Sequence, residues 1–436
     1  MLFSEIKKGV SKKNIIIVFV LILISSCIFF QKYNTGDIKQ HSSQKKELYN
    51  GLKTADYSTV KERIYGNANE EDDFVSSNVQ NYEAEKHMNE VYCYNDKIKS
   101  IINRAYELLD VKVFKESQYA TAVINKTIEI YSNVHTGYFT FEFSDGINNM
   151  ISFKFADIII ITVIIMFAYN ITNCDYDNGF TKVICTTKNG VNNLASKKIL
   201  SMIWITFKIF IFTYLPILIM SIVIWGFGDV FRTIQSLENY YRCTYCINVL
   251  EFIIIYFLAK LAVFVIISLL AMIIAEKLRN IYFTYAVVSI FSILEYVLYS
   301  YINNNSLFSI LKYANCYALI FPEKVIYNLT LINLFSKPVD AVLVELIFVL
   351  TFLFIMFILC LIAVRKHKNI IVKRKAFSLN KKIQIFKEKA ENKFRINFSK
   401  KRLLNVEFYK MFAKSKTLIV LILVGILCLR VQKYHA

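Results

Sequence analysis

Residues 250–275 read LEFIIIYFLAKLAVFVIISLLAMIIA, an apolar run with Lys260 inside it. A helix needs about 20 apolar residues to cross a bilayer, and this run is longer than the buried helices of soluble domains usually are. Only helices and closed barrels satisfy their backbone polar groups in lipid, and a uniformly apolar run is typical of the helix. The stretch therefore predicts a membrane-spanning helix.

Further runs of the same character surround it. They lie at residues 14–30, 155–171, 202–225, 281–302 and 342–364. A seventh run, at residues 417–429, is shorter than a bilayer requires. The 436 residues are 56% hydrophobic, with 11 Gly, 3 Pro and a mean hydropathy of +0.42, which exceeds the apolar share of soluble domains. We expect an all-α polytopic membrane protein with six transmembrane helices and a short seventh, in which residues 155–364 form the core.

The net charge of +19 is concentrated in a few groups. Lys and Arg gather at residues 7–13, at residues 182–198, at Lys277 and Arg279, and above all at residues 365–416. Six crossings place all of them on one side of the membrane. Because basic loops face the cytoplasm, we expect a cytoplasmic N-terminus and an extracytoplasmic segment at residues 31–154. Basic stretches beside a membrane contact anionic lipids, so we expect anionic lipids, and no nucleic acid, as their partner.

The N-terminal segment allows two interpretations. Basic residues within residues 1–13 precede the first apolar run, and the letters ISSC ending at Cys27 resemble a lipoprotein cleavage box. The apolar run nevertheless continues through Ile28, Phe29 and Phe30. An uncleaved first helix at residues 14–30 is therefore favoured over a cleaved signal.

Residues 31–154 are the one sizeable soluble segment and have the length of a single domain. Apolar residues at positions 98, 101, 102, 105, 108 and 109 follow the helical period. Residues 131–143 alternate in a way that predicts a strand. We expect a mainly helical extracytoplasmic domain with a small core.

No catalytic motif stands out in the chain. The five His residues are scattered, and the sequence holds no HExxH, GxSxG or phosphate-binding GxxxxGK[ST] pattern. Cys243 and Cys246 form a CxxC, which on its own is a weak sign of redox work or metal binding, and a surface disulfide or two thiols are the favoured alternatives. We expect a protein that is not an enzyme and that holds no metal and no cofactor of its own.

Residues 172–201 form the expected cytoplasmic loop between the second and third membrane helices. Asp175 and Asp177 precede Gly179, and Asn189–Gly190 predicts a turn. The loop could hold a short helix that docks on a partner protein, or it could be an ordinary solvated loop. Its candidate docking residues are Asp175, Asp177, Gly179, Phe180, Val183, Lys197 and Lys198.

Two segments repeat one pattern, a Glu followed by Lys at three and seven residues and then by an apolar run. These candidate entry helices carry Glu5, Lys8 and Lys12 at the start of the chain and Glu407, Lys410 and Lys414 near its end. This order of elements resembles the ABC-2 type permeases, whose halves begin with such a helix and carry an E-x-E-x-G loop after the second membrane helix. Asp175, Asp177 and Gly179 occupy the loop's places, with Asp where the family has Glu, and Lys197 or Lys198 occupies its final basic place.

The resemblance implies a permease subunit of a bacterial ABC transporter in the plasma membrane. A separate ABC-type ATP-binding subunit would bind ATP and drive export or extraction of a substrate, such as an antimicrobial peptide or a lipid-like molecule. The second pattern, within the basic linker at residues 365–416, would open a second permease half that the run at residues 417–429 only begins. The chain would then pair with a separate second half or with another copy of itself. Alternatives are a mechanotransmission-type protein and a sensor acting through the outer domain.

Two charged residues fall inside predicted membrane helices. Lys260 lies well inside the fourth helix and Glu295 toward the outer end of the fifth, at similar expected depths. A lone Lys near the bilayer centre costs on the order of 3 kcal/mol. We therefore expect an ion pair between Lys260 and Glu295, with independent contacts to headgroups or water as the alternative.

Overall fold

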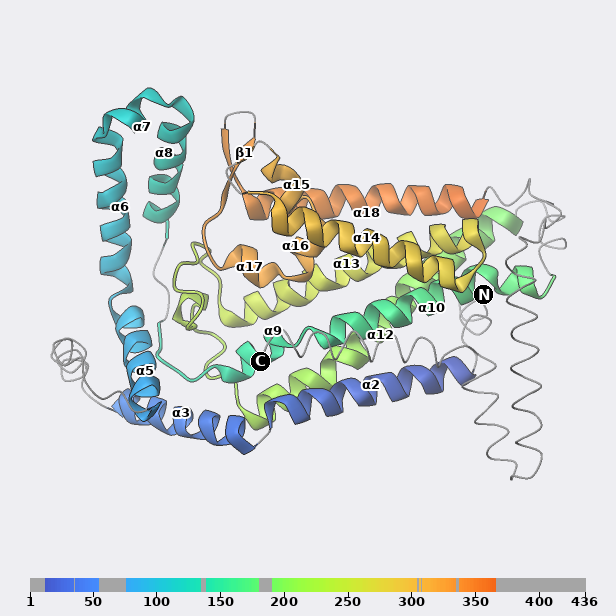
Figure 1. Cartoon of the computed structure of the whole chain (residues 1–436), viewed down its shortest axis with the longest axis horizontal. Helices are drawn as coiled ribbons and strands as arrows, with labels where there is room; N and C mark the ends of the chain where they lie inside the picture. The colour runs from blue at the N-terminus through green and yellow to red at the C-terminus, as the bar shows by residue number, and fades with distance from the viewer. Residues whose placement is uncertain are drawn as a thin grey trace.

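The computed structural model describes residues 12–34, 36–54, 76–134, 139–179, 190–303, 306, 308–334 and 337–365. Most of these residues are helical, and the long helices lie side by side in one bundle (Figure 1). The predicted seventh run and both candidate entry segments, except Lys12 at the first position of α2, lie outside the described residues.

Six helices are long and apolar enough to cross a membrane. They are α2 (Lys12–Tyr33), α10 (Phe155–Asp177), α12 (Gly190–Ile224), α13 (Val249–Leu278), α14 (Ile281–Tyr301) and α18 (Ala341–Arg365). All six predicted spans are confirmed as helices. The chain thus has the character of an all-α, multi-pass membrane protein.

The helices α10 and α13 form the centre of the bundle, and α14 and α18 lie at its surface (Figure 1). The centre is filled by side chains such as Ile160, Phe264 and Met272, each without exposed surface. Outward-facing residues of the peripheral helices, for example Ile293 and Phe354, are exposed and apolar. Lipid is as apolar as these side chains, so close packing rather than apolar burial holds such helices together.

The two ends of the bundle differ. We call the end where α2 ends and α10 begins the head end, and the end where α10 ends and α12 begins the tail end. Both α10 and α13 run from the head end to the tail end, and the helices between α2 and α10 extend beyond the head end (Figure 1).

The head helices are short and mostly polar. They are α3 (Gly36–Thr54), α5 (Ser76–Tyr92), α6 (Tyr94–Asp110), α7 (Lys112–Glu116), α8 (Gln118–Ser132) and α9 (Asp145–Ser152). In α6 the predicted positions Ile98 and Ala105 are buried, the other predicted positions are partly buried, and Tyr94 is buried as well. The Ser117 hydroxyl accepts a hydrogen bond from the Ala120 amide and caps the start of α8.

The strand predicted at residues 131–143 is wrong for the part that is described. Helix α8 continues to Ser132, and residues 139–144 form no strand ladder. The alternation has another cause: Phe141 and Phe143 are buried because both rings pack against Tyr49 of α3, at centroid distances of 4.4 and 5.9 Å.

A compact connection between α14 and α18 was not predicted. It contains α15 (Ser309–Tyr313), α16 (Cys316–Ile320), α17 (Pro322–Ile326) and an antiparallel hairpin of β1 (Leu331–Leu334) and β2 (Lys337–Asp340). A short 3₁₀ turn, η2 (Ile234–Ser236), lies in the connection between α12 and α13. These elements lie at the head end.

The loop predicted at residues 172–201 is much shorter in the structure. Helix α10 continues to Asp177, and α12 begins at Gly190. Gly179 adopts φ +73° directly after α10, the left-handed conformation that commonly ends a helix. Residues 180–189 lie outside the described residues.

Candidate functional site

A buried polar cluster lies among α10, α12 and α13. Lys260 Nζ lies 2.9 and 3.1 Å from the carboxylate oxygens of Asp157 and donates to the hydroxyl of Tyr214 at 2.9 Å. Tyr214 in turn donates to Asp157. All three residues are buried, and Lys260 has no exposed surface. We call this set the midbundle cluster.

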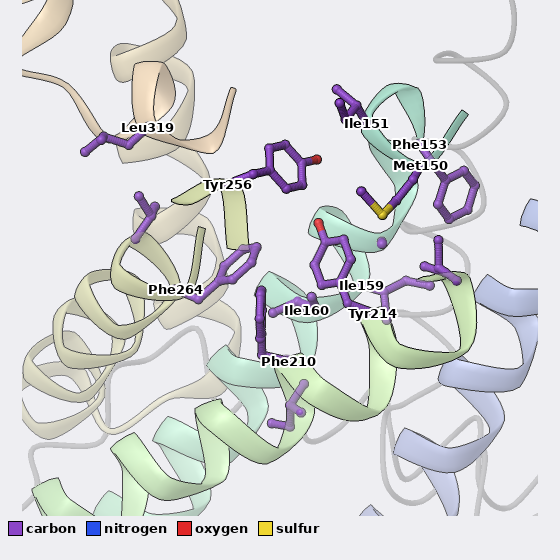
Figure 2. Close-up of a cluster of buried hydrophobic side chains, with 14 of the residues drawn as sticks. Met150, Ile151, Phe153, Ile159, Ile160, Phe210, Tyr214, Tyr256, Phe264 and Leu319 are labelled. Carbon is purple, nitrogen blue, oxygen red and sulfur yellow. The ribbon is translucent and has the colours of Figure 1, made fainter. Parts of the chain in front are cut away.

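The neighbours of Lys260 satisfy all its hydrogen-bond donors. An ammonium group has three N–H donors, and Asp157 and Tyr214 accept all of them. Its Nζ also lies 4.7 Å from the ring centroid of Tyr256, within the range of a cation–π contact. Figure 2 shows the hydroxyl groups of Tyr214 and Tyr256 directed toward one region between these helices. The charge is thus fully paired inside the bundle.

The ion pair expected between Lys260 and Glu295 is not formed: the structure gives Lys260 the partner Asp157. The register of α10 and α13 explains this. Asn173 of α10 donates to the carbonyl of Ala275 of α13 at 3.4 Å near the tail end, which brings Lys260 level with the first turn of α10. Glu295 instead accepts the backbone amide of Cys316 at 2.8 Å and so attaches α16 to α14.

A second buried ion pair joins α10 and α12 at the tail end. Lys198 Nζ lies 2.8 Å from Asp175 Oδ2 and donates to the carbonyl of Thr172 at 3.1 Å. Both side chains are at most 6% exposed. We call this pair the tail clip. Two of the candidate docking residues are therefore buried against each other rather than presented to a partner.

The other candidate docking residues differ in exposure. Asp177 and Gly179 are exposed, and Lys197 is partly exposed. Phe180 and Val183 lie outside the described residues, as do Glu5, Lys8, Glu407, Lys410 and Lys414. Among the described docking candidates, the fully exposed ones thus lie at the end of α10 and directly after it, and Lys197 adds a partly exposed side chain on α12.

A third polar network attaches the head helices to the bundle. Lys45 of α3 lies 3.1 Å from Asp145 of α9 and 2.8 Å from Glu238. Tyr49 of α3 donates to Glu238 as well, and Ser42 donates to Asp145 at 3.3 Å. We call this set, with His87 of α5, the junction network.

His87 is the buried end of the junction network. Its Nδ1 lies 3.1 Å from the Tyr49 hydroxyl, and its Nε2 lies 3.1 Å from the carbonyl of Ser236. A carbonyl only accepts, so Nε2 carries the hydrogen. Burial lowers the pKa of His87 to about 4, which leaves the imidazole neutral at pH 7.

The charges of the junction network influence one another. Burial disfavours the charged form of Lys45, but the nearby Glu238 and Asp145 carboxylates have a larger effect and raise the pKa of Lys45. Burial also disfavours the charged form of Glu238, but the positive charge of Lys45 has a larger effect and holds the pKa of Glu238 below its usual value. The network therefore keeps charged Lys45 and Glu238 paired at neutral pH.

Next to this network, two glycines allow close backbone contacts. A Cβ at Gly146 would lie 2.3 Å from the carbonyl oxygen of Gly226, and one at Gly228, which has φ +66°, would lie 2.6 Å from Glu142. Glu142 accepts from Lys53 at 2.7 Å and from the amide of Asp229. The segment before α9 is therefore held tightly to the connection between α12 and α13.

Metal-binding side chains and the CxxC cysteines are the remaining candidate groups for chemistry. They contain no group of three or more His, Cys, Asp or Glu side chains that could hold a metal ion. Cys243 is fully buried, whereas Cys246 is exposed, so the CxxC places its thiols in different surroundings. Burial raises the pKa of Cys243 to about 12, which makes its thiolate scarce.

Sequence reasoning singled out Lys260, Asp175 and Lys198, but it missed the partners of Lys260 and did not predict that Asp175 and Lys198 pair. Asp157 carried a signal, because it is an acid within an apolar run. Tyr214 and the residues of the junction network carried none that separates them from other polar residues. Comparison of the chain with protein-family models, curated proteins and solved structures finds no match.

Proposed function

We propose that this chain is the membrane subunit of an ATP-driven transporter of the ABC-2 kind, in the plasma membrane of a bacterium with its tail end in the cytoplasm. A separate ATP-binding subunit would act at the tail end, and the chain would convert its motion into export or extraction of a substrate. The resemblance in residue pattern motivates the proposal, and the charge distribution sets the orientation.

The observation that carries the proposal is the way α10 is attached. It is the most buried of the six long helices. Its first turn is paired with α13 through Asp157 and Lys260, and its last turn is paired with α12 through Asp175 and Lys198. A displacement at the exposed end of α10 would therefore move along a stiff helix into the centre of the bundle. Such an element suits a subunit that transmits motion and performs no chemistry itself.

A photo-crosslinking experiment tests this proposal. Benzoylphenylalanine replaces the exposed Asp177 at the tail end or, as matched control, the exposed Glu83 at the head end. In membranes of the native host, we expect the Asp177 position to crosslink to an ATP-binding protein, and vanadate-sensitive ATP hydrolysis to copurify with the chain. The Glu83 position should give no such product. Failure to capture an ATP-binding protein at Asp177, or its capture at Glu83, would contradict the proposal.

A mechanotransmission role is the second candidate, and the junction network favours it. Lys45 bridges α3 to α9 and to Glu238, so the head helices are bonded to the segment that leads into α10. Motion of α10 could therefore reach the head helices without passage of a substrate. Transport assays in vesicles with the ATP-binding partner separate the two roles: ATP hydrolysis without net substrate movement supports mechanotransmission.

A further inference from the structure

Several oxygen atoms near the head end are buried and have no hydrogen-bond partner among the described residues, and three of them belong to residues close to Phe153 and Lys154. These three are Oη of Tyr33 on α2, Oη of Tyr256 on α13 and Oε2 of Glu323 on α17. Tyr256 has no exposed surface, and Tyr33 is 8% exposed. Buried polar atoms almost always have partners, so three such atoms from three helices require an explanation.

These groups share one region of the bundle. The Tyr256 ring lies 4.7 Å from Lys260 Nζ, and Glu323 pairs at 2.7 Å with Lys154, which follows Phe153 in the chain. Figure 2 shows the Tyr256 hydroxyl pointing from α13 toward the side where Met150 and Phe153 lie. The Tyr33 ring packs against the Phe153 ring at a centroid distance of 6.5 Å. The three residues that carry these oxygens therefore all lie near Phe153 and Lys154 at the head end.

The charges of this region are already balanced. Lys154 lies 2.7 Å from Glu323 Oε1, and Lys260 lies 2.9 Å from Asp157. An additional ion would therefore leave an uncompensated buried charge, which is costly. The groups still able to form hydrogen bonds are the hydroxyls of Tyr33 and Tyr256, which can donate and accept, and Glu323 Oε2, which accepts.

Aromatic rings form the apolar border of the same region. Trp225 lies 6.1 Å from Tyr33 and 5.8 Å from Phe29, and Phe29 lies 5.0 Å from Phe153 (ring centroids). Binding sites for small molecules combine such apolar walls with a few convergent polar groups. A ligand that matches would carry neutral hydroxyl groups on an apolar body.

We propose that Tyr33, Tyr256 and Glu323 bind the hydroxyl-bearing headgroup of a neutral lipid. The lipid would enter from the bilayer beside α2, which is far less buried than α10 and α13. Its hydroxyl groups would donate to Glu323 and exchange hydrogen bonds with the two tyrosines. This binding requires no ATP-binding subunit, so it stands or fails independently of the proposed transport function.

The chain contains two Trp residues, and one of them can report on the site. Trp204→Phe removes the half-exposed Trp204 and leaves Trp225, which contacts Tyr33 and Phe29. This full-length variant is reconstituted into phosphatidylcholine vesicles and titrated with monooleoylglycerol. Methyl oleate, which lacks hydroxyl groups, and free glycerol, which lacks the chain, serve as the comparison ligands.

We expect a saturable change in Trp225 emission with monooleoylglycerol and none with methyl oleate or glycerol. Tyr256→Phe and Glu323→Gln should each weaken binding at least tenfold. Tyr285→Phe is the matched control, because the hydroxyl of Tyr285 already donates to the Thr162 carbonyl at 2.8 Å, and it should bind as the parent does.

Three results would overturn the proposal. The first is an emission change that does not saturate, and the second is an equal response to methyl oleate. The third is equal binding by the Tyr256→Phe and Tyr285→Phe variants. If Glu323→Gln does not fold, Tyr33→Phe replaces it under the same tenfold criterion, with thermal unfolding of each variant showing that it is intact.

Discussion

The ion pairs inside the bundle and those on the head helices have the same chemistry in opposite surroundings. The side chains of Lys260 and Asp157 are 0% and 6% exposed, whereas those of Lys126 and Glu129 on α8 are 39% and 60% exposed. A buried charge that loses its partner is stranded in a medium of low dielectric, but an exposed charge is solvated by water. The buried pairs therefore determine how the helices pack against one another, whereas the exposed pairs contribute little to the free energy of unfolding.

The largest effect is expected in the midbundle cluster. Lys260→Met leaves Asp157 unpaired and should lower the free energy of unfolding by about 3–5 kcal/mol. The double variant Asp157→Asn/Lys260→Met removes both charges and should lose much less than the two single changes summed. Thermal unfolding of the purified chain in detergent measures each value. As a control, Lys260→Met combined with Glu295→Gln should be additive, and additivity in the Asp157 double variant would refute the pairing.

The tail clip should give a smaller loss, because it lies near the end of the bundle where water is closer. Lys198→Met is expected to cost about 2–3 kcal/mol in the same assay. The exchange Asp175→Lys/Lys198→Asp restores opposite charges and should recover part of the loss. If the exchange variant is no more stable than Lys198→Met alone, the pair does not hold α10 to α12.

The junction network is intermediate and should depend on pH. Burial depresses the pKa of His87 from 6.5 to about 4, so the folded protein favours the neutral ring. The corresponding stability is complete above about pH 6.5 and is lost as the pH falls toward 4; about 2 kcal/mol should be lost between pH 7 and pH 5. The measurement is thermal unfolding of the parent and of His87→Gln at both pH values. An equal pH dependence in the two proteins would exclude this role for His87.

The smallest effect is expected for the exposed pair on α8. Lys126 Nζ lies 3.0 Å from Glu129 Oε2, one helical turn away. Because both side chains are largely solvated, Lys126→Ala should change the free energy of unfolding by less than about 0.5 kcal/mol. A loss comparable to that of Lys198→Met would show that exposure does not distinguish the two classes of ion pair.

The membrane helices could be predicted from the sequence because the length of an apolar run is a local property. The predicted spans at residues 155–171 and 202–225 are too short at the tail end. There α10 continues to Asp177 and α12 begins at Gly190, because the polar residues Asp175 and Lys198 are part of the helices and pair with each other. A charge in a span predicts that a partner exists. It does not predict which partner, because that depends on the register between helices.

The head end was less predictable for the same reason. The helical period of α6 was readable, because that helix has one apolar face. The junction network joins α3, α5, α9 and the α12–α13 connection, which are distant in the sequence and carry ordinary polar residues. Its geometry arises from tertiary packing and leaves no periodic signal.

The proposed transmission of motion by α10 from the tail end to the head end is tested most directly by double electron–electron resonance between two spin labels. Spin labels at Glu83 of α5 and at Tyr301, which is 83% exposed at the head end of α14, report the position of the head helices. In the complex with the proposed ATP-binding subunit, we expect ATP to shift the distance distribution in the parent chain. The shift should be much smaller in Asp157→Asn/Lys260→Met, in which α10 is no longer paired with α13. A distribution that ATP leaves unchanged, or a full shift in the double variant, would contradict this role of α10.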